Sequence, residues 1–269
     1  MEEIEAIFYI EGLSSDKKAL ENALRETAEN LKNEKNLKVT EVNVEDVIEE
    51  GEEPLRYSGV ITARVRGPFD ELVKAVLKYG PAIVEVVRPG KFEIDSEELM
   101  KILGEVSLVM GKLMDRFGGL AAYPDLTELP EPKIGFSREK IEELITDDRY
   151  IRYRFVIEVS GKDEESVRST MAKAFTLEGC LINSFVLQGE QFVDKYRGLL
   201  AAELLSPFDV MFQLTAKYAP VAISIVEPEV VDITANELQN ALTDLGGFVN
   251  ELVTRPVKKM LMKKDEKNE

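Results

Sequence analysis

The sequence predicts an α+β protein in which one strand-and-helix unit, built on an antiparallel sheet, occurs twice. The first observation is an internal duplication: residues 57–103 align without a gap to residues 196–242, and 15 of the 47 aligned pairs are identical. The second is the spacing of apolar residues in each copy. In some segments they recur at every second position, which is typical of strands, and in others at every third or fourth position, which is typical of helices. The length of 269 residues suits two domains of roughly 100 to 150 residues each.

We expect four regions along the chain. They are a first repeat (residues 1–118), a linker (119–147), a second repeat (148–257) and a charged, basic tail (258–269). Gly and Pro punctuate the start of the linker and disfavour regular structure there. A short helix is expected at its end, near residues 137–146.

Each repeat is expected to begin with a strand and then a helix. Residues 4–10 and 151–157 place apolar side chains at every second position, as a half-buried strand does. Apolar residues then recur by threes and fours, which predicts one buried helix stripe per repeat. The stripes are Leu20, Leu24, Ala28 and Leu31 in the first repeat and Val167, Met171, Ala174 and Phe175 in the second.

Two strands and a second helix should follow in each repeat. The strands are predicted at 37–44 and 58–66, and at 180–187 and 197–205. The second helix should start at Pro68 or Pro207, because proline in the first turn gives up no helical hydrogen bond. Ser206 and Asp209 resemble a capping box at the second of these starts.

A fourth strand and a third helix are expected to complete each repeat. The strand should stop at Pro89 in one copy and Pro228 in the other, because proline cannot donate to a strand ladder. The third helix should begin with the capping patterns of residues 95–98 and 234–237. Gly246 and Gly247 lie within the second of these helices and indicate close approach of a neighbour or a kink.

This βαββαβ order with an added C-terminal helix resembles the split-βαβ, ferredoxin-like plan. The resemblance covers both repeats and implies an open antiparallel sheet with its helices on one side. It implies nothing about function, because this fold serves many unrelated activities.

The composition limits the chemistry that the chain can perform. It has no His, which is the usual general base near neutral pH and the commonest metal ligand, and it has a single Cys. Cys180 stands beside a strand-like run and is interpreted as a small buried side chain. We expect no metal, no cofactor and no catalytic constellation. The acidic residues Glu49, Glu50, Glu52 and Glu53 are interpreted as a solvated loop, since their spacing lacks the alternation of a calcium loop.

The net charge of −17 disfavours nucleic acid and anionic membranes as partners. The C-terminal lysines are an exception, but a solvated helix end explains them. With an acidic start and no long apolar run, we expect a cytoplasmic protein. The richness in Glu and Lys and the absence of Trp and His are typical of proteins that work at high temperature.

The open face of each predicted sheet carries apolar side chains, which are normally covered by something. We expect these faces to pack on each other or on a second protomer, so the protein is a candidate homo-oligomer. The residues expected at this interface are Ile7, Tyr9, Ile83, Val87, Val156, Leu199, Ala201 and Leu205.

Two short elements, Tyr-x-Gly and Lys-Tyr-x-Pro, recur in both repeats. A functional interpretation makes them paired ligand sites, whereas turn chemistry and packing are the simpler explanation. The candidate ligand-binding residues are Tyr57, Lys78, Tyr79, Tyr196, Lys217 and Tyr218.

The sequence favours a non-catalytic regulatory or protein-interaction protein. A variant of this interpretation, by analogy with other tandem ferredoxin-like proteins, binds a small effector between the two repeats. An enzyme that uses carboxylate, lysine or tyrosine chemistry in the cleft between the repeats is the alternative. Its nominal candidates are Asp70, Asp209, Lys78 and Lys217. Differences between the repeats, such as Arg64 against Glu203, disfavour a strictly symmetric site.

Overall fold

The computed structural model describes residues 3–50, 55–121, 126 and 128–265, with residues 257–265 described by their backbone alone. The chain forms two compact units. Unit 1 contains residues 1–92, 116–118 and 234–269, and unit 2 contains residues 93–115 and 119–233. Each unit has an open antiparallel sheet with helices, so the predicted α+β class with antiparallel sheets is confirmed.

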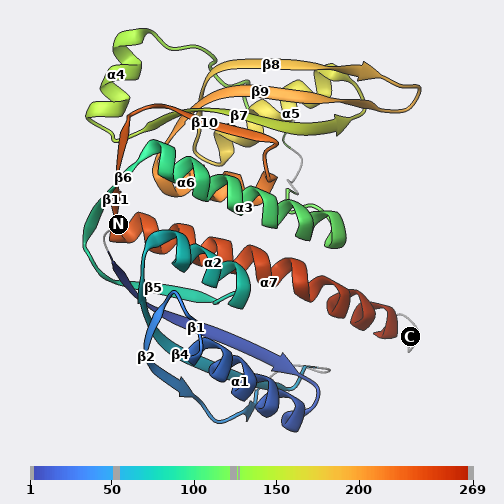
Figure 1. Cartoon of the computed structure of the whole chain (residues 1–269). Helices are drawn as coiled ribbons and strands as arrows, with labels where there is room; N and C mark the ends of the chain where they lie inside the picture. The colour runs from blue at the N-terminus through green and yellow to red at the C-terminus, as the bar shows by residue number, and fades with distance from the viewer. Residues whose placement is uncertain (1–2, 51–54, 122–125, 127, 266–269) are drawn as a thin grey trace. The chain divides into compact units, whose positions relative to one another are not determined.

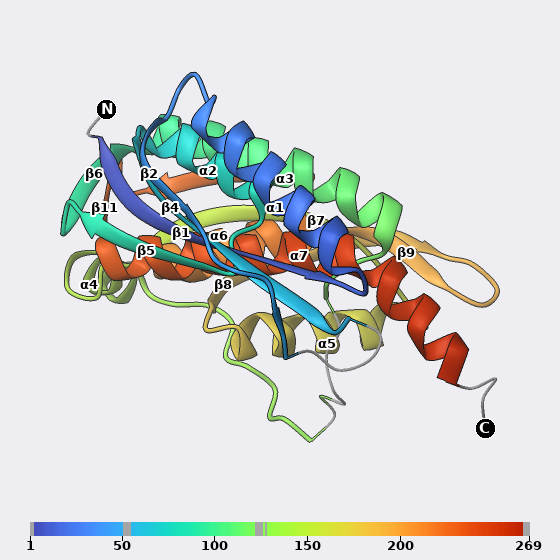
Figure 2. The same cartoon turned by 90° about the horizontal axis from the view of Figure 1, so that it is seen from below.

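The sheet of unit 1 has the strand order β2-β4-β1-β5, with β3 paired to β4. Figure 2 shows these strands together. Their bounds are β1 Ile4–Ser14, β2 Lys38–Val44, β3 Ile48–Glu49, β4 Tyr57–Gly67 and β5 Ile83–Arg88. The core side is made by alternate residues such as Ala6, Phe8 and Ala63, which are fully buried. The period of two seen in the sequence is therefore the alternation between core and outer face.

The helices described in unit 1 are α1 (Lys17–Lys32), α2 (Phe69–Tyr79) and α7 (Ala235–Asp265). Asp16 caps α1 by accepting a hydrogen bond from the Ala19 N–H. Pro68 stands at the start of α2, as expected. Helix α7 packs against β5 and α2 and covers the edge of the sheet, as Figure 1 shows. Covering an edge strand removes a template for unwanted strand pairing.

The sheet of unit 2 has the order β8-β9-β7-β10. Its strands are β7 Ile151–Gly161, β8 Leu181–Gln191, β9 Tyr196–Ser206 and β10 Ala222–Glu227. Its helices are α3 Ser96–Phe117, α4 Arg138–Thr146, α5 Glu164–Leu177 and α6 Phe208–Tyr218. Aromatic rings of Phe155, Phe175 and Tyr218 pack edge to face in its core.

The compact units do not follow the two repeats that the sequence predicts. Helix α3 lies at the end of the first predicted repeat, but it belongs to unit 2 through Asp115. Helix α7 lies at the end of the second predicted repeat and belongs to unit 1. The chain passes from one unit to the other within two short strands, β6 (Lys91–Asp95) and β11 (Val230–Thr234), which pair with each other. Neither strand is predicted by the sequence pattern. Periodicity shows that a helix has an apolar stripe, but not which sheet it covers.

Several local expectations can be compared with the structure. Strands β5 and β10 end directly before Pro89 and Pro228, as predicted. Thr234 and Glu237 form the predicted capping box at the start of α7. Ser206, however, does not cap α6: its hydroxyl lies in the core, 3.2 Å from that of Tyr153. The capping prediction at this helix is wrong because the hydroxyl has a buried polar partner instead.

Candidate functional site

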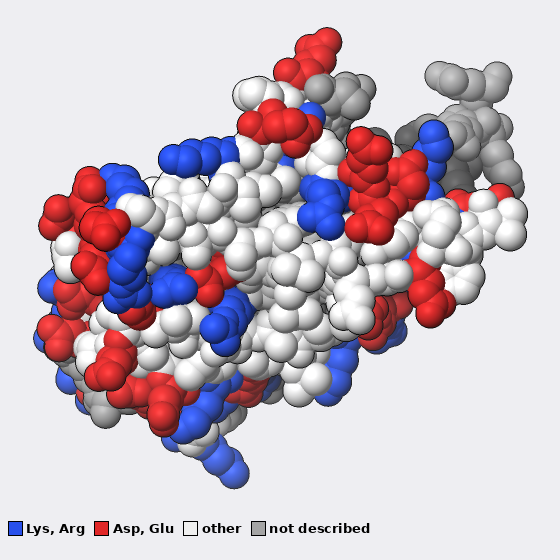
Figure 3. All heavy atoms as spheres, turned by 90° about the horizontal axis from the view of Figure 1, so that it is seen from above, with Lys and Arg blue, Asp and Glu red and all other residues white. Residues whose placement is uncertain are grey.

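The outer face of the unit 2 sheet exposes a strip of uncharged side chains. Val186 and Leu199 are 60% and 46% exposed, and Ala201 and Ala222 are also exposed. Val156 is half-buried and stands in register with Ala201 and Ala222 on the neighbouring strands. Figure 3 shows a broad region without charged side chains on this side of the molecule. We call these five residues the outer strip.

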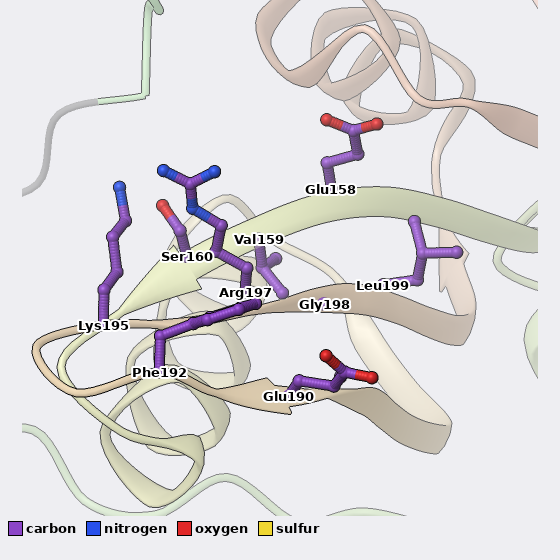
Figure 4. A pocket seen from close by; sticks show the side chains of 10 residues that line it. Glu158, Val159, Ser160, Glu190, Phe192, Lys195, Arg197, Gly198 and Leu199 are labelled. Carbon is purple, nitrogen blue, oxygen red and sulfur yellow. The ribbon is translucent and has the colours of Figure 1, made fainter.

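A pocket of about 700 Å³ lies at one end of the outer strip. It is formed by the ends of β7, β8 and β9 and by the turn between β8 and β9. Figure 4 shows the side chains of Glu158, Lys195 and Arg197 pointing to the same side of these strands. The lining residues that carry polar or aromatic groups are Glu158, Ser160, Glu190, Phe192, Lys195 and Arg197.

The charged side chains of this pocket make no ion pair within the described part of the chain. These are the carboxylates Glu158 and Glu190 and the cations Lys195 and Arg197. The Phe192 ring beside them is 54% exposed. Unpaired charges of both signs next to an exposed ring suit a partner that brings opposite charges and an apolar group.

Two glycines set the width of the strand pair beneath the pocket. Gly189 and Gly198 face each other across β8 and β9. A Cβ atom on Gly189 would lie 2.3 Å from the Arg197 carbonyl oxygen, and one on Gly198 would lie 2.5 Å from the Gln188 carbonyl oxygen. Neither strand accepts a side chain here, so close backbone packing explains the glycine of this Tyr-x-Gly element.

The opposite end of the outer strip holds an ion-pair network. The Arg152 guanidinium donates to Glu203 at 2.8 Å and to Glu227 at 3.3 Å. Asn183 Nδ2 donates to the same Glu203 oxygen at 2.7 Å. Burial works against the ionised form of Glu203, but the hydrogen bonds from Asn183 and Arg152 outweigh it, and the pKa of this carboxyl is lowered. Arg138 of α4 binds Glu227 through both of its terminal nitrogens.

Helix α4 covers one of the residues expected at the interface. Leu205 is fully buried in a cluster with Ile141 and Leu144 of α4. The expectation that Leu205 contributes to an open surface is therefore wrong. The linker helix provides its cover, and the sequence had no signal that placed this helix on the outer face.

The outer face of unit 1 carries the remaining residues expected at the interface. Ile83 and Val87 are 55% and 43% exposed, whereas Ile7 and Tyr9 are half-buried. The Tyr9 hydroxyl donates to Glu85 at 3.2 Å. A charged side chain, Glu85, therefore lies between Ile83 and Val87 on this face, opposite Ile7.

The candidate ligand-binding residues do not form one shared site. In unit 1, Lys78 and Tyr79 both donate to Glu34 beyond the end of α1, at 2.6 and 2.5 Å. In unit 2, Lys217 pairs with Glu178 at the end of α5. These contacts tie the second helix of each unit to its first helix.

The three other tyrosines among the candidates have separate surroundings. Tyr57 is half-buried at the start of β4. Tyr218 lies in the aromatic core of unit 2. Tyr196 is 2% exposed, and burial raises the pKa of its phenol. Its hydroxyl has no hydrogen-bond partner within the described residues.

The nominal catalytic carboxylates also have local roles. The Asp70 carboxylate pairs with Lys74 one turn along α2, at 3.1 Å. Asp209 accepts from the Val210 N–H in the first turn of α6. A carboxylate in the first turn stabilises the positive end of a helix, which is the role that the sequence pattern indicated for Asp70 and Asp209.

Among the described residues there is neither a cluster of metal ligands nor a helix that could span a membrane. No cluster of acidic or thiol groups there is arranged to hold a metal ion. Of the acidic loop, Glu49 lies 3.8 Å from Arg56, whereas Glu52 and Glu53 fall outside the described residues. Within the described helices, none is long and apolar enough to span a bilayer.

Comparison with known proteins identifies one family. The sequence model of the MJ0538 family matches residues 5–261. The chain is also similar to a protein of Methanocaldococcus jannaschii named "Uncharacterized protein MJ0538". The two are 28% identical over 260 residues, which cover 94% of this chain and 97% of that protein. No solved structure matches the chain.

Proposed function

This chain belongs to the MJ0538 family, and from its geometry we propose that it is a non-catalytic, cytoplasmic interaction protein. In this proposal the outer strip of unit 2 binds a second copy of the chain. The main support is that five uncharged side chains lie together on an exposed face. They lie next to a pocket whose charged side chains make no ion pair among the described residues. Exposed apolar surface of this kind is typical of binding surfaces.

The charge arrangement supports a second copy as the partner. The pocket at the end of the strip holds two cations and two carboxylates. In a twofold contact, the same patch meets itself, so Lys195 and Arg197 of one copy would face Glu158 and Glu190 of the other. Each copy carries a net charge of −17, so two copies repel each other. The strip carries no charge and therefore adds no like-charge repulsion at the contact.

We also propose that both units are ferredoxin-like and descend from a tandem duplication. The orders β2-β4-β1-β5 and β8-β9-β7-β10 place corresponding strands in corresponding positions. Pro68 and Pro207 stand at the starts of α2 and α6. Leu99 and Leu238 are both buried on the third helices of the repeats. These matches at aligned positions support a shared architecture.

Sedimentation velocity over a wide concentration range tests the proposed self-association. The wild type is expected to form a dimer that Leu199→Glu weakens, because a carboxylate would be buried in the contact. Ile83→Glu on the outer face of unit 1 is the matched control, since Ile83 is similarly exposed. A monomeric wild type at high concentration, or equal weakening by both variants, would contradict the proposal.

A further inference from the structure

Helices α7 and α3 cover the edge strands of their units with different side chains. In unit 1, Thr243 Oγ1 accepts from the Val84 N–H at 3.0 Å, and Gln239 accepts from the Val86 N–H at 3.1 Å. Asn250 Nδ2 donates to the Gly80 carbonyl at 2.6 Å. Side chains of α7 therefore satisfy two N–H groups on the open edge of β5 and the carbonyl of Gly80, which ends α2.

The same edge in unit 2 is covered less completely. Met100 Sδ lies 3.3 Å from the Ile225 N–H and occupies the place of Gln239 in the aligned repeats. The places of Thr243 and Asn250 are taken by Gly104 and Gly111. A Cβ atom on Gly104 would meet nothing within 4 Å. At these two positions α3 therefore offers neither a hydroxyl nor a carboxamide. The Ser107 hydroxyl of α3 lines the same space and donates to the Pro220 carbonyl at 2.7 Å.

The space left by these glycines is a groove of about 580 Å³ between α3 and β10. Its walls include Leu108 and Val221, which are 59% and 56% exposed. Lys112 and Asp115 lie at one end. The volume lies within the range of small-molecule sites, which combine apolar walls with a few polar groups.

Backbone groups at the floor of the groove are oriented as in unit 1. Alternate N–H groups of an edge strand point the same way, so the Ile223 N–H points to the same side as that of Ile225. Ala219 ends α6 with a φ of 44°, and Gly80 ends α2 with a φ of 53°. The Ala219 carbonyl is therefore placed like the Gly80 carbonyl that Asn250 binds.

We propose that the groove between α3 and β10 binds a small molecule that carries a carboxamide or hydroxyl group next to an apolar group. Its oxygen accepts from the Ile223 N–H, and its N–H or O–H donates to the Ala219 carbonyl. Its apolar part contacts Leu108 and Val221. The ligand thus supplies in unit 2 the hydrogen bonds that Thr243 and Asn250 supply in unit 1.

Isobutyramide is a suitable probe, because it joins a carboxamide to a branched apolar group. A ligand of this size binds weakly, with a dissociation constant on the order of millimolar. In an NMR titration of the full chain, the amide signal of Ile223 is expected to shift in a saturable way. Isobutyrate, which has the same shape but cannot donate when ionised, is expected to cause a much smaller shift.

Variants that fill the groove make the test specific. Gly104→Thr places on α3 the threonine that α7 carries at the aligned position 243. Its hydroxyl would occupy the Ile223 N–H, so isobutyramide should bind at least about tenfold more weakly. Gly104→Ala adds a methyl group that does not reach Ile223, and it should retain binding while favouring the helix. Gly111→Asn should also weaken binding. Absence of a saturable Ile223 shift in the wild type, or unchanged binding by folded Gly104→Thr, would overturn the proposal.

Discussion

Glu5 on β1 and Arg152 on β7 occupy corresponding places in the two sheets, but they carry opposite charges. Glu5 accepts from Arg64 at 2.7 Å and from Arg88 at 2.6 Å. The Arg64 and Arg88 guanidiniums hold the pKa of the Glu5 carboxyl below its usual range. In the sheet of unit 1, the negative charge of Glu5 is therefore held by two positive charges from the neighbouring strands β4 and β5.

In unit 2 the whole arrangement is inverted, because Arg152 is held by Glu203 and Glu227. The residues aligned with Arg64 and Arg88 are these two glutamates. A charge triad keeps its attraction when all three signs are reversed together, so the inversion preserves the contact while changing the net charge of the face. Single changes in either triad leave an uncompensated charge.

The first prediction concerns Glu203. Its folded-state pKa lies below the ordinary value of 4.5, so the carboxylate stabilises the fold above this pH and loses that effect as the pH falls through the lower folded value. Glu203→Gln is expected to reduce the free energy of unfolding at neutral pH by about 1–3 kcal/mol. The difference in the free energy of unfolding between Glu203→Gln and the wild type should become smaller as the pH falls. Urea denaturation at neutral pH and at low pH measures both effects.

Glu11→Gln is the control for this experiment, because Glu11 is exposed, lies outside the proposed contact and makes no ion pair among the described residues. It should leave the free energy of unfolding nearly unchanged at both pH values. A difference between Glu203→Gln and the wild type that is constant across this range would contradict the stated role of the carboxylate.

The second prediction concerns the cover of β5 by α7. Thr243→Ala removes the hydroxyl that accepts from the Val84 N–H, and Val84 is fully buried. We expect a loss of about 1–2 kcal/mol in the free energy of unfolding, because a backbone donor loses its partner. Thr243→Ser retains the hydroxyl and should lose less. Thermal or chemical denaturation of both variants measures the difference, and equal losses would contradict a role for the hydroxyl.

The third prediction concerns Cys180. The thiol is 1% exposed, and burial raises its pKa to about 12. The reactive thiolate is therefore scarce at neutral pH, and reagents have no direct access. A chromogenic disulfide reagent should leave the native protein unlabelled and should label one thiol per chain in guanidinium chloride. Rapid labelling of the native protein would show that the core around Tyr153 and Ser206 opens readily.

The fourth prediction concerns the strand pair under the pocket. Gly189→Ala would place a methyl group 2.3 Å from the Arg197 carbonyl oxygen, so β8 and β9 must separate. We expect a loss of about 1–3 kcal/mol in the free energy of unfolding, the usual cost of overpacking. Gly90→Ala is the control, because a Cβ there meets nothing within 4 Å. If the two variants are equally stable, the close approach of the strands does not constrain this position.

Much of the local structure could be predicted from the sequence, because its causes are local. Alternation in β1 and β7 and the helical stripes of α1 and α5 follow from which side chains must leave water. Pro89 and Pro228 end strands because proline lacks an N–H group, wherever the strand lies. The short strands β6 and β11 were missed because five residues carry too little periodicity to be recognised.

The candidate sites were harder to predict, because they depend on pairings between distant segments. The exposed Leu199 and the buried Leu205 both lie on the outer face of β9, and only the position of α4 distinguishes them. The pocket at Arg197 and Lys195 requires the register of three strands. A hairpin tip that carries Phe192 and Val193 was the one local signal that could have indicated it.

The sequence by itself determined that the chain has two similar sets of strands and helices, where most of them begin and end, and which side chains are apolar enough to be buried. The tertiary structure alone decided that α7 covers β5 and α3 covers β10. The physical reason is that an apolar stripe is attracted to any complementary surface. Hydrogen bonds such as that from Val84 to Thr243 form only once the fold has brought distant residues together.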